Sequence, residues 1–393
     1  MSRPFLSRFI NNTNTSTSNS RVLCLYLVAL VALFLCVVLE NHQHSSQVLA
    51  ASRVKARDDP YLKILEEATT VTDDNLGCIA FNPYVQGYNE KRGPHPPPEL
   101  IETLMDRLVT QTKFRCISIY HYSNGLDHVF PVARKLGVRI ISIIWLEPPP
   151  FDNILVIEQG IQLAKDFPDV LIGLSCGSEF MLRNPKDVAE RIILDCIDRF
   201  RNASLNQPLT SHELATNYCE WNDAGCSQTS VAQKLDYLSI NIFPWWGNKY
   251  GGCFIAEQAP GQHMGEYMMI RNAYADKHIV ISENGWPAGP YGFSYRDNCG
   301  IASELDQDIA IVESLKMYRQ NGMASIIFEF VREPWKKEYE SVEAEFWGIC
   351  EEYPPYNCKA IHLMLEEGGM MTRAQCASSQ SICSGECFDP KYY

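Results

Sequence analysis

The chain has 393 residues and a formal net charge of -13, and 46% of its residues are hydrophobic and 21% charged. These proportions are those of a globular protein with a sizeable core, and they argue against disorder over most of the length. The acidic balance excludes nucleic acid as an expected partner, because phosphate binding requires a clustered basic face.

Residues 22–39 form a stretch of eighteen uncharged residues, VLCLYLVALVALFLCVVL. This stretch can just span a bilayer, and it exceeds the apolar core of a cleaved signal peptide, which has about 7–15 residues. The sequence therefore predicts a signal-anchor helix in a single-pass type II membrane protein. Residues 1–21 would be a cytoplasmic tail and residues 40–72 a stalk, with the remainder extracellular or luminal. The alternative is a protein secreted after cleavage near Ala50.

Cysteine usage agrees with an oxidising compartment. Of the 15 cysteines, Cys24 and Cys36 lie in the apolar stretch, which leaves thirteen in the exported part. We expect disulfides among these, and the odd number leaves at least one thiol free or paired with another chain. Residues 350–393 are predicted to be a cysteine-rich extension, containing Cys350, Cys358, Cys376, Cys383 and Cys387.

Two smaller motifs complete this part of the prediction. The spacing CSGEC near the C-terminus lacks the second ligand pair of a structural zinc site, so no metal is expected there. Asn202-Ala203-Ser204 is an acceptor sequence for N-glycosylation in an exported protein.

Short apolar segments recur from Leu76 onward, separated by segments with helical periodicity such as 99–112 and 304–322. Strands are expected at residues 76–81, 115–120, 138–145, 170–176, 208–214, 236–243, 278–283 and 324–330, of which 208–214 has the weakest pattern. Almost continuously apolar strands that alternate with helices are typical of a parallel sheet buried on both faces. Eight such units over residues 73–349 predict an α/β fold, a (β/α)8 TIM barrel, with a doubly wound sheet as the alternative.

In such a barrel the functional face lies at the carboxyl ends of the strands. The residues that follow the expected strands are rich in aromatic, amide and carboxylate side chains, and include Tyr84, Tyr120, Asn241, Phe243 and Trp286. Amides and carboxylates hydrogen-bond sugar hydroxyls, and flat rings pack against the apolar faces of pyranoses. The pattern therefore predicts a saccharide-binding cleft.

Two glutamates follow buried strands at this face. Glu179 ends the fourth expected strand and Glu283 ends the seventh. These strands lie on one side of the mouth of an eight-stranded barrel, so we expect carboxyl groups about 5 Å apart, the separation that retaining glycosidases use. A single glutamate is usually a solvated surface residue. Two glutamates at strand ends, flanked by Gly, Ser and Trp, instead indicate a catalytic pair.

Several segments together resemble glycoside hydrolase family 17, which contains β-1,3-glucanases, glucan β-glucosidases and glucanosyltransferases. ISENGWPAG at residues 281–289 resembles the family's nucleophile motif, and LIGLSCGSEF at 171–180 resembles its acid/base motif. DYLSINIFPWW at 236–246 resembles its sixth strand, and residues 326–349 resemble its last strand and the following loop. The resemblance covers residues 76–349.

The resemblance implies that Glu179 is the proton donor and Glu283 the nucleophile of a retaining hydrolase acting on β-glucan, mostly β-1,3-linked. It implies that Glu333 and Lys336 lie on the substrate side, because they stand at the family's spacing. No cofactor is implied.

Three residues depart from the family's pattern. Ser178 stands where the family has an Asn that holds the sugar 2-hydroxyl, Phe243 stands where a Tyr is usual, and Ser118 stands where an Arg is common. Ser178 can donate a hydrogen bond only from a shorter side chain, Phe243 lacks the hydroxyl of Tyr, and Ser118 lacks the charge of Arg. Two alternatives to a hydrolase therefore stay open, a glucanosyltransferase of the same fold and a catalytically weak glucan-binding surface protein.

Overall fold

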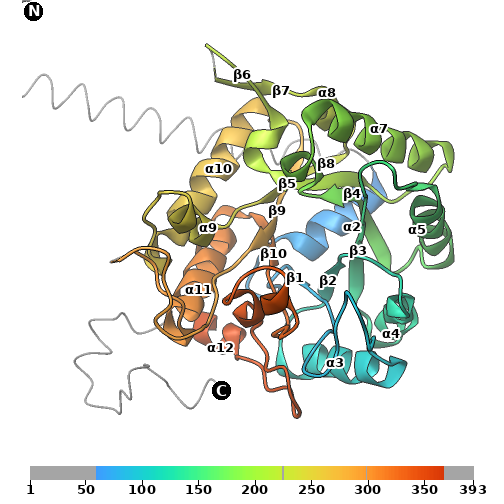
Figure 1. Ribbon diagram of the computed structural model, residues 1–393. Coiled ribbons are helices and arrows are strands. Elements are labelled where there is room, and N and C mark those ends of the chain that lie inside the picture. The colour runs from blue at the N-terminus through green and yellow to red at the C-terminus, as the bar shows by residue number, and fades with distance from the viewer. Residues whose placement is uncertain (1–58, 224, 298, 367–393) are drawn as a thin grey trace, which may run out of the picture. The chain divides into compact units, whose positions relative to one another are not determined.

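The computed structural model describes residues 59–223, 225–297 and 299–366. Eight parallel strands close into a barrel in the order β1-β10-β9-β8-β5-β4-β3-β2 (Figure 1). The strands are β1 (Cys78–Ala80), β2 (Cys116–Ile119), β3 (Arg139–Ile144), β4 (Leu171–Ser178), β5 (Leu209–Leu214), β8 (Tyr237–Asn241), β9 (His278–Asn284) and β10 (Ala324–Ile327). The predicted TIM barrel is confirmed, including its weakest strand, and the doubly wound alternative is wrong.

Helices surround the barrel, and several of them turn one apolar face towards it. In α3 (Pro98–Gln111), for example, the buried residues Ile101, Leu104, Met105 and Leu108 recur at helical spacing. The other long helices of the outer ring are α4 (Val129–Leu136), α5 (Ile154–Asp166), α7 (Lys186–Asn202), α10 (Ala259–Ala273) and α11 (Glu304–Asn321). Shorter helices are α6 (Phe180–Arg183), α8 (Ser230–Lys234), α9 (Pro244–Lys249) and α12 (Ile361–Glu366). The strands, covered on both faces, are almost entirely buried.

A further helix, α2 (Pro60–Thr69), closes the end of the barrel where the strands begin. Its N-terminus is capped by the Asp59 side chain, which accepts hydrogen bonds from two backbone N–H groups. Its apolar residues Leu62 and Leu65 pack among the first residues of several strands. Residues 60–69 were assigned to a stalk, and this assignment is wrong because their apolar face belongs to the core of the barrel.

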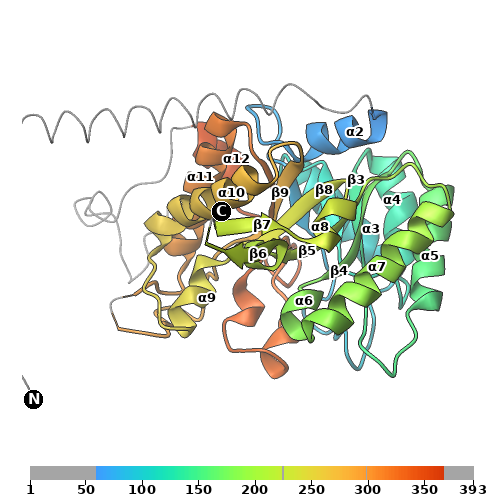
Figure 2. The same cartoon turned by 90° about the horizontal axis from the view of Figure 1, so that it is seen from above.

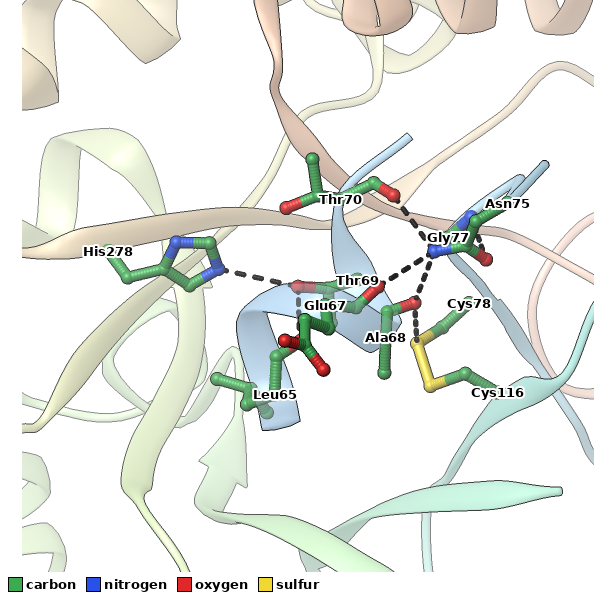
Figure 3. The surroundings of a disulfide bond; sticks show 10 residues. All are labelled: Leu65, Glu67, Ala68, Thr69, Thr70, Asn75, Gly77, Cys78, Cys116 and His278. Carbon is green, nitrogen blue, oxygen red and sulfur yellow. Dashed lines mark hydrogen bonds between the residues drawn. A yellow bond between two sulfur atoms is a disulfide. The ribbon is translucent and has the colours of Figure 1, made fainter. Parts of the chain in front are cut away.

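The junction between α2 and the first strands is held covalently and by hydrogen bonds (Figure 3). A disulfide joins Cys78 of β1 to Cys116 of β2. The Asn75 side chain donates to three backbone carbonyl groups at the end of α2, and the Thr69 hydroxyl lies 3.3 Å from Nε2 of His278. These contacts fix the closed end of the barrel.

Four other disulfides lie among the described residues, and the expectation of an oxidising compartment is consistent with them. They join Cys176 to Cys196, Cys219 to Cys226, Cys253 to Cys299 and Cys350 to Cys358. The second of these closes a hairpin of β6 (Cys219–Asn222) and β7 (Gly225–Gln228). Cys24, Cys36, Cys376, Cys383 and Cys387 lie outside the described residues.

The segment after residue 349 continues the barrel domain as far as it is described. The buried ammonium of Lys359 lies 2.6 Å from Oδ1 of Asp308 and 2.8 Å from Oε2 of Glu304, both in α11. Cys350 also bridges to Val331 through the backbone. The predicted boundary at residue 350 is therefore not a structural break, because buried ion pairs tie both sides together.

No helix within residues 59–366, apart from the undescribed positions 224 and 298, is long and apolar enough to cross a membrane. The predicted signal-anchor helix at residues 22–39 lies outside the described residues.

Candidate active site

A cleft of about 750 Å³ opens where the strands end. Its walls come from the ends of β2, β3, β4 and β9 and from the loop after β10, and they include Tyr120, Trp145, Ser178, Glu179, Glu283 and Lys336. Figure 2 shows that α6, which follows Glu179, and α2 lie at opposite ends of the barrel. The cleft therefore lies at the carboxyl ends of the strands, which is the face predicted to carry the functional residues.

Glu283 lies at the end of β9 and is almost completely buried, with 7% of its surface exposed. The Ser178 hydroxyl donates a hydrogen bond of 3.1 Å to its Oε1 atom, and the Tyr120 hydroxyl also hydrogen-bonds the carboxylate. Burial raises the pKa of Glu283, and the nearby charge of Glu179 raises it further. The two hydroxyl groups and the Lys336 ammonium oppose this rise because they favour the ionised form.

Glu179 follows the last residue of β4 and lies partly exposed in the cleft. Its φ of 50° is in the left-handed region, which non-glycine residues rarely adopt. The Glu179 N–H donates to the His212 carbonyl of β5 at 2.6 Å. Its Oε1 atom accepts from Nδ2 of Asn241 at 3.2 Å, and Nη1 of Arg183 lies 3.9 Å from Oε2. This carboxylate is thus more accessible than that of Glu283 and sits beside it.

Lys336 forms a buried charge cluster with Glu329 and Glu333 in the loop after β10. Its ammonium lies 2.7 Å from Oε2 of Glu329 and 2.5 Å from Oε2 of Glu333. Burial acts to lower the pKa of Lys336, but the two carboxylates outweigh it and raise this pKa. Burial and the charge of Glu329 in turn raise the pKa of Glu333. Lys336 reaches the cleft wall, whereas Glu333 supports it from behind.

Five of the eight predicted substrate-binding residues do not line the cleft: Tyr84, Asn241, Phe243, Trp286 and Glu333. Trp286 is fully buried, donates from Nε1 to the Ile301 carbonyl at 2.8 Å and packs edge-on against Trp245. Tyr84 is also fully buried, and its hydroxyl lies 3.0 Å from Nδ1 of His95. The long loops after β1 and β9 fold back and bury both side chains, so neither lines the cleft, and their contact with substrate stays a prediction.

Phe243 is the third of these residues. Its ring packs edge-on against Phe328, which does line the cleft, and against Trp347. Phe243 thus supports the wall through a second aromatic ring. Asn241 does not line the cleft either, but its contact with Glu179 places it next to the predicted chemistry.

Two further groups of residues line the cleft. Trp145 lines the wall with the Arg183 guanidinium 4.7 Å above its ring, and its Nε1 atom donates to Glu147 at 3.0 Å. Trp145 directly follows β3, so its place among the residues after the strands predicts its position in the cleft. Arg183 gives no such signal, since it becomes part of the cleft only through the short helix α6.

The second group surrounds Glu90 in the loop after β1. Its carboxylate accepts from Nδ2 of Asn82 at 3.0 Å and lies 3.7 Å from Nε2 of His121. Burial acts to raise the pKa of Glu90, but the hydrogen bonds and charges of its neighbours prevail and lower it to about 2. Glu90 does not directly follow β1, so the expectation that functional residues come straight after the strands does not identify it.

Comparison with known proteins identifies the domain. Residues 78–348 match the family described as the BtgE/BtgC glycoside hydrolase domain. The chain belongs to this family.

Curated relatives of this BtgE/BtgC domain include two Aspergillus proteins. One is the probable glucan endo-1,3-beta-glucosidase btgC of Aspergillus clavatus, 23% identical over 254 residues, or 58% of this chain and 34% of the relative. Another is the putative glucan endo-1,3-beta-glucosidase btgC of Aspergillus niger, 23% identical over 282 residues, or 64% of this chain and 39% of the relative. The chain spans only slightly more than a third of the length of these relatives.

Solved structures share the fold of the BtgE/BtgC barrel. The glycoside hydrolase family 17 beta-1,3-glucanosyltransferase from Rhizomucor miehei is 20% identical, with a TM-score of 0.54 over 70% of this chain and 92% of that one. An endo-laminarinase from Formosa Hel1_33_131 is 18% identical, with a TM-score of 0.58 over 70% of this chain and 83% of that one. At these identities the likeness establishes the fold.

Proposed function

We propose that this BtgE/BtgC domain is a member of glycoside hydrolase family 17 that cleaves β-1,3-linked glucan with retention of configuration. The observation that carries the proposal is the pair of carboxylates at the ends of β4 and β9, of which Glu283 is buried and hydrogen-bonded and Glu179 is open to the cleft. The names of the Aspergillus relatives support the substrate class. So does a solved Rhizomucor miehei neighbour described in complex with laminaritriose.

In the proposed mechanism Glu283 attacks the anomeric carbon while Glu179 protonates the leaving oxygen. A covalent glycosyl-enzyme forms, and Glu179 then removes a proton from the incoming water, which releases the sugar. Glu283 must react as a carboxylate, and the hydroxyls of Ser178 and Tyr120 together with the Lys336 charge favour that form. Nδ2 of Asn241 donates a hydrogen bond to Oε1 of Glu179 and helps to orient this carboxylate.

The departures from the family's pattern bear on the efficiency of this mechanism. The Ser178 side chain is shorter than the usual amide but still donates to the nucleophile. Tyr120 supplies a hydroxyl to the same carboxylate, which offsets the hydroxyl absent from Phe243. Ser118 is buried, its hydroxyl has no hydrogen-bond partner in the described part of the chain, and it adds no charge. These contacts support catalysis over a role as a glucan-binding protein alone.

A glucanosyltransferase is the second candidate function. In that reaction another sugar takes the place of water, so an acceptor must stay bound on the side of the proton donor. Trp145 and Arg183 form a flat, partly exposed surface beside Glu179 that suits a sugar ring. The name of the Rhizomucor miehei neighbour supports the same possibility.

Two further proposals concern the exported chain and rest on the sequence. Residues 22–39 are proposed to anchor it in a membrane, with secretion after cleavage near Ala50 as the alternative. Asn202, exposed at the end of α7, is proposed to carry a glycan.

The proposed function is tested by measuring reducing ends and product lengths from laminari-oligosaccharides with wild type, Glu283→Ala and Glu179→Gln. Loss of either catalytic group is expected to lower kcat at least about 100-fold. Glu266→Gln is a matched control, because Glu266 lies on the outer helix α10. Products longer than the substrate would identify transfer. Wild-type binding without turnover, or full activity of both variants, would refute the mechanism.

A further inference from the structure

A third glutamate lies next to the proposed acid/base and has no part in the mechanism above. Glu213 is in β5, next to β4, and its side chain is completely buried. It does not line the cleft. A fully buried carboxylate is costly unless it is well hydrogen-bonded, so its partners indicate what it does there.

One partner of Glu213 lies in the short helix that follows Glu179, and the other two lie in β5 and in the turn after it. The Met181 N–H donates to both carboxylate oxygens, at 3.1 and 3.2 Å. Nδ2 of Asn217 donates to Oε2 at 3.1 Å, and the Ser211 hydroxyl lies 3.2 Å from Oε1. Met181 is the second residue of α6, so its N–H is one of the groups that a helix leaves without an internal partner.

A helix N-terminus is normally capped by the side chain of the residue that precedes it. In α6 that residue is Glu179, whose side chain makes no capping hydrogen bond. Glu213 supplies the acceptor from the neighbouring strand instead. The Glu179 carboxylate is thereby left free to face the cleft.

The backbone at Glu179 also needs support. Its left-handed conformation is unfavourable in a non-glycine residue and persists only where the surroundings impose it. Consecutive residues of β5 hold both sides of this position, since the His212 carbonyl accepts the Glu179 N–H and the Glu213 carboxylate accepts the Met181 N–H. The two anchors bracket the proposed acid/base.

We propose that Glu213 is a positioning residue that holds Glu179 in place for proton transfer by capping α6 from β5. The inference rests on the proposed function, because it assigns Glu213 a role in orienting the acid. It predicts a defect confined to the step in which the acid acts.

The test uses Glu213→Gln in the full chain, with two kinds of substrate. General acid catalysis contributes about 10²–10⁴-fold when the leaving group is a poor one, and it contributes little when the leaving group is a stable anion. We expect kcat on laminari-oligosaccharides to fall roughly tenfold or more. The rate of glycosyl-enzyme formation from a 2,4-dinitrophenyl β-glucoside, followed as release of 2,4-dinitrophenolate, should change less than about threefold, and KM for the oligosaccharides should stay the same.

Two further variants keep the test decisive if Glu213→Gln folds poorly. Asn217→Ala removes a donor to Glu213 from a partly exposed position and should produce the same selective defect in weaker form. Glu266→Gln replaces a partly buried glutamate on α10 and should leave both substrates unaffected. Thermal unfolding reports the stability of each variant separately from its activity.

Equal losses on both substrates, or no loss in Glu213→Gln beyond a lower Tm, would overturn the inference. Glu179→Gln distinguishes this from a failure of the proposed function. If Glu179→Gln shows the selective defect and Glu213→Gln does not, only the positioning role is wrong. If Glu179→Gln keeps full activity on oligosaccharides, the assignment of the acid itself is wrong.

Discussion

Replacing Ser178 with Ala removes one hydroxyl from the proposed nucleophile and leaves the barrel otherwise intact. Ser178 is buried in the floor of the cleft, and its hydroxyl donates to Oε1 of Glu283 at 3.1 Å. A hydrogen bond to a carboxylate stabilises its ionised form. Loss of the hydroxyl therefore raises the pKa of Glu283 beyond the rise that burial already causes.

The size of the effect follows from the type of hydrogen bond. A bond to a charged group contributes about 1.5–3 kcal/mol, and about 1.4 kcal/mol corresponds to one pKa unit. Because Ser178 lines the cleft, water can replace part of the lost bond, so we expect a rise of about one unit. The acid limb of kcat/KM should then move by about one unit to higher pH, and activity below this limb should fall about tenfold.

The assay is the pH profile of kcat/KM on laminari-oligosaccharides, which reports the ionisation of essential groups in the free enzyme. Ser142→Ala is the matched control, because Ser142 in β3 is equally buried and its hydroxyl has no partner among residues 59–366 as described. Ser178→Asn introduces the family's usual amide, and its acid limb of kcat/KM should lie at lower pH than that of Ser178→Ala. An acid limb that is the same in Ser178→Ala and Ser142→Ala would refute the reasoning.

Two other predictions concern buried residues. Lys336→Met leaves Glu329 and Glu333 without their cation, and breaking a buried ion pair costs about 3–5 kcal/mol, so Tm and activity should both fall. An unchanged Tm would show that the cluster adds no stability. Trp286→Phe removes the hydrogen bond to Ile301 and should lower the free energy of unfolding by about 1–3 kcal/mol in urea titrations while KM stays constant. A raised KM would show that Trp286 contributes to substrate binding.

The strands could be predicted from the sequence because each is a short apolar run. The two central carboxylates could be predicted because the functional residues of a parallel barrel lie at the carboxyl ends of its strands. Glu179 and Glu283 lie one residue from the ends of their strands, where the rule applies directly. The rule fails for Trp286 and Tyr84, since residues deeper in a loop follow the fold of the loop and not the direction of the strand.

Contacts between segments distant in sequence could not be predicted in this way. Glu213 caps a helix that begins thirty-three residues before it, from 213 back to 180. Helix α2 lies outside the eight-unit pattern, and the structure shows that its apolar residues Leu62 and Leu65 are buried against the strands. Such roles depend on which strands are neighbours in space, which periodicity alone does not reveal.

Helix α2 has a consequence for how the domain can be presented to a polymer. It closes the barrel at the end opposite the cleft, and the chain enters the domain there, at Asp59. Asp59 and the mouth of the cleft therefore lie at opposite ends of the barrel, so a polymer that enters the cleft would not meet α2.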